Sequence, residues 1–216
     1  MKAAYAKWFA LALALAAAFA LLASGPGTRF GAWDYRAGFD LLRWGVCIGG
    51  AAAVIGLIGL VVPKLRTGNV SVLLLALIVG LVCVALPLQF RSRAGSVPRI
   101  NDISTDFANP ATAEEQKKGY PDLKPLELAV APDAAYSRAL AAAEAMRWEI
   151  VKSDPKARTL EAVDTTPWFG FKDDITVRVS AAGRGSRVDM RSKSRVGRSD
   201  LGTNARRIRG YLQHLK

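Results

Sequence analysis

Residues 70–89 read VSVLLLALIVGLVCVALPLQ, a run of twenty residues without a charged side chain. A helix needs about 20 apolar residues to cross the roughly 30 Å hydrocarbon core of a bilayer, so this run predicts a membrane span. Two more uncharged runs precede it, WFALALALAAAFALLA over residues 8–23 and WGVCIGGAAAVIGLIGLVV over residues 44–62. Three successive runs argue against helices buried in a soluble core and predict a multi-pass anchor over residues 1–90.

The charged residues divide the chain into two parts that face different surroundings. Residues 1–90 carry seven Lys or Arg and two acids, whereas residues 91–216 carry 23 bases and 16 acids. The second part is long enough to bury a core of its own. We therefore expect a basic domain over residues 126–216, joined to the anchor by an extended, proline-punctuated linker over residues 91–125.

Two rules give opposite orientations for this anchor. Lys2 and Lys7 directly precede the first run and favour a cytoplasmic N-terminus, which would place the domain outside the cytoplasm after three spans. The bases flanking the spans are slightly more numerous on the other side, and this count favours the opposite orientation. The first run also fits a cleaved signal peptide, but cleavage would leave the domain on the same side. We expect a multi-pass protein of the inner membrane with a periplasmic C-terminal domain.

Periodicity predicts the elements of the domain. Tyr136, Leu140 and Ala143 recur at helical spacing after Pro132, and alternation predicts strands near residues 148–153, 159–166, 175–180 and 186–196. Gly183-Arg184-Gly185 marks a hairpin turn, and an apolar stripe from Leu201 to Leu215 predicts a final helix. The expected fold class is α+β: three transmembrane helices, then a two-layer domain with a four-stranded antiparallel sheet and two helices on one face.

Three stretches of the domain resemble a known family. They are PRINDISTDFANP from Pro98, EAVDTTPWFGFKDDITVRV from Glu161 and VDMRSKSRVGRSDLGTNARRIRGYL from Val188. The chain resembles the bacterial and plastid proteins grouped as domain-of-unknown-function family 1499, and its N-terminal helices look like those of membrane-anchored members. The resemblance implies an exported or lumenal domain and supports the domain boundaries. It implies no reaction and no ligand.

A basic strand that turns into a helix is the strongest candidate for a binding site. Helix N-termini attract anions because their N–H groups are unpaired and the helix dipole is positive there. The predicted anion-binding residues are Ser194, Arg195, Arg198, Ser199, Asp200, Asn204 and Arg206. The alternative is that Ser199, Asp200 and Asn204 only build the strand–helix junction and that the arginines form a solvated face.

Two other groups of residues are weaker candidates. Trp168, Phe169 and Phe171 fall in a loop between two strands, where they would enter the membrane interface, close over an apolar ligand or fold back onto the core. The acids Asp102, Asp106, Asp173 and Asp174 form a possible acidic site, since paired carboxylates can transfer protons or hold a cation. No calcium-binding loop pattern surrounds them, so we expect neither a metal nor a cofactor.

Several classes of function have no support in the sequence. His214 is the only histidine and no cysteine follows Cys83, which argues against a Ser-His-Asp triad and a zinc site in the domain. The membrane helices and the expected topology argue against a nucleic-acid partner. We expect a non-catalytic envelope protein whose domain binds an anionic ligand, a lipid headgroup or a partner protein. The alternatives are an enzyme that acts on a lipid or cell-wall substrate through Asp and Arg, and a structural assembly subunit.

Overall fold

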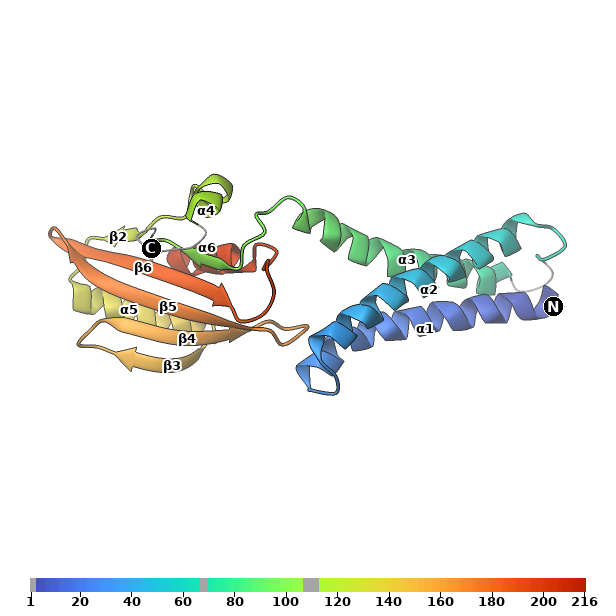
Figure 1. The fold of residues 1–216 in the computed structure, drawn as a ribbon, viewed down its shortest axis with the longest axis horizontal. Helices are drawn as coiled ribbons and strands as arrows, with labels where there is room; N and C mark the ends of the chain where they lie inside the picture. Colours follow the sequence, from blue (N-terminus) through green and yellow to red (C-terminus); the bar gives the residue numbers. More distant parts are fainter. Residues whose placement is uncertain (1–2, 67–69, 107–112) are drawn as a thin grey trace. The chain divides into compact units, whose positions relative to one another are not determined.

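The computed structural model describes residues 3–66, 70–106 and 113–216. The chain forms two compact units. The first comprises Met1–Arg93 with Pro167–Gly170, and the second comprises Ala94–Thr166 with Phe171–Lys216. The first unit is a set of three long helices and the second is a mixed α+β domain (Figure 1).

Each apolar run lies within a longer helix. The helices are α1 (Ala3–Arg29), α2 (Tyr35–Val61) and α3 (Val70–Ala94), and all three are long and apolar enough to cross a membrane. α2 starts nine residues before the apolar run at Trp44 because Asp34 caps it, its Oδ1 accepting a 2.8 Å hydrogen bond from the Ala37 N–H. α1 likewise continues through Pro26 to Arg29.

Small residues bring the three helices together. Ala10 and Ala14 of α1, Ala52 of α2 and Ala76 of α3 are buried in one cluster. Gly49 of α2 and Gly80 of α3 meet backbone to backbone, since a Cβ at Gly80 would lie 2.5 Å from the Gly49 carbonyl oxygen. Such close approach lets helices gain van der Waals contact in lipid, where burial of apolar surface gives no driving force.

The domain contains a mixed-length antiparallel sheet of six strands. Along the chain these are β1 (Asp102–Ser104), β2 (Leu126–Leu128), β3 (Glu149–Asp154), β4 (Thr159–Thr165), β5 (Lys172–Ala182) and β6 (Gly185–Ser194). The order across the sheet is β1-β6-β5-β4-β3. Both β1 and β2 pair with β6, β1 with residues 191–193 and β2 with residues 186–188. Helices α4 (Ala113–Gly119), α5 (Pro132–Ala145) and α6 (Thr203–His214) complete the domain.

The sheet is therefore larger than the four strands predicted from alternation. The four predicted strands correspond to β3, β4, β5 and β6, and their antiparallel pairing is confirmed. β1 is added because residues 91–125, predicted as a linker and lead-in, contribute to the fold, and β2 follows directly after them at Leu126. This lead-in contains β1 and α4, and it buries Ile100, Ile103 and Leu123 in the core.

The two faces of the sheet differ in composition. Helices α5 and α6 cover one face of the sheet (Figure 1). Val177, Val188 and Met190 are buried in the core on this face. The open face carries the alternate positions of the same strands. It displays charged residues that include Arg178, Arg187, Arg191, Lys193 and Arg195. This alternation of the strand after Gly185 agrees with the sequence prediction.

The final helix differs from its prediction at its first turn. α6 begins at Thr203, and Leu201, expected in its apolar stripe, lies before the helix with 51% of its surface exposed. Ala205, Ile208 and Leu215 are buried as predicted. The helix starts late because Leu201 and Gly202 both adopt positive φ angles, 54° and 76°, which cannot continue a right-handed helix.

Candidate functional site

The connection between β6 and α6, residues 195–202, is fixed by the segment that precedes β1. The Asn101 side-chain amide donates a 2.6 Å hydrogen bond to the Gly197 carbonyl. The Asp200 N–H donates to the Ile100 carbonyl at 3.2 Å. These hydrogen bonds join two segments that lie almost a hundred residues apart in the sequence. We call residues 195–202 the β6–α6 turn.

Asp200 caps the N-terminus of α6. Its two carboxylate oxygens accept hydrogen bonds from the N–H groups of Gly202 (2.8 Å) and Asn204 (2.7 Å), and its carbonyl accepts from Thr203 (3.0 Å). Burial raises the pKa of the Asp200 carboxyl, and the two N–H donors counteract this shift in part. The helix N-terminus therefore already holds a carboxylate of the chain itself.

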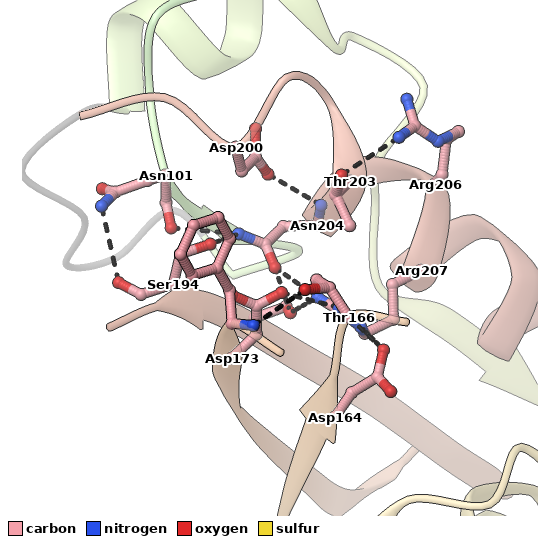
Figure 2. A network of polar contacts seen from close by, with 12 residues as sticks. Asn101, Asp164, Thr166, Asp173, Ser194, Asp200, Thr203, Asn204, Arg206 and Arg207 are labelled. Atoms are coloured by element: carbon pink, nitrogen blue, oxygen red, sulfur yellow. Dashed lines mark hydrogen bonds and ion pairs between the residues drawn. The ribbon is translucent and has the colours of Figure 1, made fainter. Parts of the chain in front are cut away.

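Beneath the turn lies a buried polar network centred on Arg207 of α6 (Figure 2). The Arg207 guanidinium donates to Asp164 of β4 at 2.8 Å, to Asp173 of β5 at 2.7 Å and to the Ser192 hydroxyl at 2.9 Å. It also bonds the side-chain oxygen of Asn204. Because Arg207 is 6% exposed, these bonds compensate most of the cost of removing its charge from water.

Asn204 connects this network to the β6–α6 turn. Its amide group donates to the Ser194 hydroxyl at 3.0 Å and to the Asn101 carbonyl at 3.1 Å. Its oxygen accepts from the Ser192 hydroxyl at 2.7 Å. With the bond from Arg207, the Asn204 amide donates two hydrogen bonds and accepts two. These bonds fix the end of β6 relative to α6.

Each of the four acids that were predicted to form an acidic site is paired with a different arginine. The pairs are Asp102–Arg191 (2.5 Å), Asp106–Arg178 (2.6 Å), Asp173–Arg207 (2.7 Å) and Asp174–Arg195 (2.7 Å). The neighbours Asp173 and Asp174 point to opposite faces of β5, as strand geometry requires. Within the described residues, no group of three or more His, Cys, Asp or Glu is placed to hold a metal ion.

Among the predicted anion-binding residues, the structure separates a buried group from a surface group. Ser194, Asp200 and Asn204 lie together in the buried network, as described above. Arg195 lies on the open face in a bidentate contact with Asp174, and this contact lowers the pKa of the Asp174 carboxyl. Arg198 is exposed and forms no ion pair within the described ranges.

The two other predicted anion-binding residues serve the backbone of the turn. Arg206 donates to the Leu201 carbonyl and to the Thr203 hydroxyl, both at 3.1 Å. The Ser199 hydroxyl accepts a long hydrogen bond of 3.4 Å from the Leu201 N–H.

Two more bases lie near this region but were not among the predicted anion-binding residues. Lys193 lies on the open face directly between Asp102 of β1 and Asp174 of β5. Arg99 is exposed one residue before Ile100, whose carbonyl contacts the turn. Like Arg198, neither forms an ion pair in the part of the chain that the structure describes. The alternation along β6 was a sufficient signal for Lys193, but no local pattern placed Arg99 beside a turn 100 residues away.

The aromatic loop connects β4 to β5. Thr166 and Phe171 close it, since the Thr166 N–H donates to the Phe171 carbonyl at 2.8 Å and the Phe171 N–H donates to the Thr166 hydroxyl at 2.9 Å. Trp168 is 46% exposed. The role of Trp168, Phe169 and Phe171 at a membrane interface stays a prediction.

These features define a class: a small two-layer α+β domain that follows three apolar helices suited to a membrane anchor, with a rigid, basic turn between its last strand and last helix. The family model of a protein of unknown function (DUF1499) matches residues 102–215, from the first residue of β1 to the end of α6. The match covers more than half of the chain, and the chain belongs to this family. No curated protein matches the sequence.

Proposed function

We propose that this protein is a non-catalytic, membrane-anchored envelope protein whose domain binds an anionic, phosphate-bearing ligand at the β6–α6 turn. The observation that carries the proposal is the contrast between buried and exposed groups at the turn. Asn101, Asp200 and Asn204 fix its backbone, while Arg198 stands exposed without an acidic partner among the described residues. A rigid backbone reduces the entropy lost when a ligand binds.

The distribution of ion pairs directs the binding to this end of the domain. Arg178, Arg187 and Arg191 on the open face are already paired with Asp106, Asp189 and Asp102. Arg99 and Arg198 are exposed near the turn and form no ion pair within the described chain. Lys193 lies next to the turn on the open face, in register between Asp102 and Asp174, but forms no ion pair with either in the described chain. A phosphate there gains charge-assisted hydrogen bonds without first breaking an internal ion pair.

The Asp174–Arg195 ion pair argues against Asp174 as a general base. A general base at neutral pH needs a pKa near the working pH, but Arg195 lowers the pKa of the Asp174 carboxyl away from that range. His214 is exposed at the far end of α6, where its Nδ1 contacts the Gly210 carbonyl at 2.8 Å. We place the domain on the periplasmic side of the inner membrane, on the strength of Lys2 and Lys7 before the first span.

The test uses full-length protein in neutral detergent micelles and glycerol 3-phosphate, the soluble part of a phospholipid headgroup, as the probe. Binding is followed by broadening of the probe's phosphorus NMR line, which detects weak and rapidly exchanging ligands. We expect broadening that decreases with added salt, because screening weakens contacts between exposed charges. Loss of one charge-assisted hydrogen bond of about 1.5 kcal/mol weakens binding about tenfold.

A matched pair of variants separates the turn from the overall basic charge. Lys193→Glu combined with Arg198→Glu is expected to remove the broadening. Arg184→Glu changes an exposed base in the β5–β6 turn, at the opposite end of β6, and should leave the broadening intact. No broadening with the wild-type protein, or equal broadening with the double variant, would show that the turn does not bind phosphate.

A further inference from the structure

The β6–α6 turn exposes aliphatic side chains among its bases. Val196 is 39% exposed and Leu201 is 51% exposed, and Arg198 lies between them in the sequence. Lys193 and Arg99 flank the same turn, as described above. A soluble ligand such as a single phosphate makes no use of exposed aliphatic groups. A surface that joins aliphatic side chains to surrounding bases instead fits the boundary between lipid headgroups and acyl chains.

Leu201 adds a second, independent observation. Its φ angle is 54°, in the left-handed region that glycine and asparagine adopt more easily than leucine. A leucine in this conformation is strained, and here half of its side chain faces solvent rather than the core. The backbone geometry does not favour a leucine at this position, and only about half of its surface is buried. An external apolar contact accounts for a leucine here, and strained residues of this kind concentrate at binding sites.

The chain path limits how far this turn can be from the membrane. α3 ends at Ala94 and β1 begins at Asp102, so residues 95–101 are the only connection between the last apolar helix and the sheet. Since β1 runs antiparallel to β6, the chain enters the sheet at the end where β6 leaves it for the turn. Residues 95–101 span at most about 25 Å when fully extended. The turn therefore lies at the end of the domain where the chain from α3 enters the sheet.

We infer that the β6–α6 turn docks on the surface of the bilayer that holds α1, α2 and α3. Val196 and Leu201 enter the interface, and Arg99, Lys193 and Arg198 contact the phosphates of anionic lipids. This inference rests on the proposed function and names its ligand as an anionic phospholipid surface. It explains why aliphatic and basic side chains share one turn, because apolar contact and attraction to anionic headgroups add in interfacial binding.

The experiment places an environment-sensitive NBD fluorophore on the turn of the full-length protein. Val196→Cys is made in a background in which Cys47 and Cys83 are serine, and the labelled protein is reconstituted into nanodiscs. The discs contain phosphatidylcholine alone or phosphatidylcholine with phosphatidylglycerol. In the anionic discs we expect a blue-shifted emission that lipids carrying a doxyl group quench. The same label at Arg184→Cys, in the β5–β6 turn, should keep the emission of a fluorophore in water.

The outcomes distinguish the docking from the proposed function on which it rests. A label at position 196 that stays water-like in anionic discs, in a protein that still broadens the glycerol 3-phosphate line, would overturn the docking alone. Equal insertion into neutral and anionic discs would overturn the role of the bases. If the wild-type protein did not bind glycerol 3-phosphate, the proposed function itself would be overturned.

Discussion

Replacing Arg207 with methionine should destabilise the domain by about 3–5 kcal/mol. Arg207 is 6% exposed, and the side chain of its partner Asp173 is 3% exposed. Methionine fills much of the same volume but leaves a buried carboxylate without a counter-charge. Breaking a buried ion pair from one side typically costs this amount, because the remaining charge has lost its hydration and gained nothing in return.

Arg209→Met is the matched control on the same helix. Arg209 also makes a bidentate contact, donating to the Asp122 carboxylate at 2.6 and 2.8 Å, but its side chain is 39% exposed and that of Asp122 is 53% exposed. Water can hydrate both groups after the contact is lost. The expected cost is therefore at most about 1 kcal/mol.

The assay is urea unfolding of the full-length protein in neutral micelles, followed by near-ultraviolet circular dichroism. The rings of Trp148 and Tyr211 stack with centroids 5.0 Å apart, and Tyr211 lies on α6, so their signal reports the core of the domain. Adding Asp173→Asn to Arg207→Met should restore part of the lost stability, since it removes the orphaned charge. If Arg207→Met lowers the free energy of unfolding by no more than Arg209→Met does, the buried network does not stabilise the domain as the structure indicates.

Three further predictions concern the cap, the membrane helices and the strained leucine. The raised pKa of Asp200 means that the folded protein holds this proton more tightly than the unfolded chain, so stability falls as the pH rises above about 4. Urea titrations at a series of pH values from about 4 upward should show that the free energy of unfolding of the wild-type protein falls relative to that of Asp200→Asn. An equal pH dependence of the two proteins would contradict this prediction. Gly80→Ala places a Cβ 2.5 Å from a carbonyl oxygen of α2 and should cost about 1–3 kcal/mol, measured by thermal unfolding in micelles. Gly50→Ala, with no atom closer than 3.8 Å, should be tolerated, and equal losses would refute the packing. Leu201→Asn should keep the free energy of unfolding within about 1 kcal/mol of wild type, because relief of strain offsets the lost burial of half a leucine, and a larger loss would show that Leu201 serves the core.

The long elements of the fold were predictable because their periodicity extends over several turns or pairs. The apolar runs located all three helices, and alternation located β3 to β6. β1 was not predicted because a strand of three residues shows too little alternation to be recognised. The short apolar run from Leu126 did predict a strand where β2 lies, but it was not counted in the four-stranded sheet. The pairing of β1 and β2 with β6 depends on contacts between residues at least 58 positions apart. The ends of α1 and α2 were missed because both helices continue beyond their apolar runs.

The candidate site was only partly predictable for a related reason. The sequence from Arg178 onward is dense in arginine and poor in acid, which predicts a positive surface. In the folded domain, acids from distant segments, such as Asp102 and Asp122, neutralise many of these arginines. Which bases stay without a partner depends on strand register, and no local pattern encodes it. Arg207 was missed altogether, since an arginine on a basic helix gives no sign that it is buried.

The most direct test of the account is the side of the membrane on which the domain lies. The reporter is a single cysteine at Arg184, an exposed position in the β5–β6 turn, in a background in which Cys47 and Cys83 are serine. An impermeant thiol reagent is then added to cells with a permeable outer membrane and an intact inner membrane. We expect labelling before lysis, which would place the domain on the periplasmic face. Labelling only after lysis would place the domain in the cytoplasm and contradict the envelope function proposed for it.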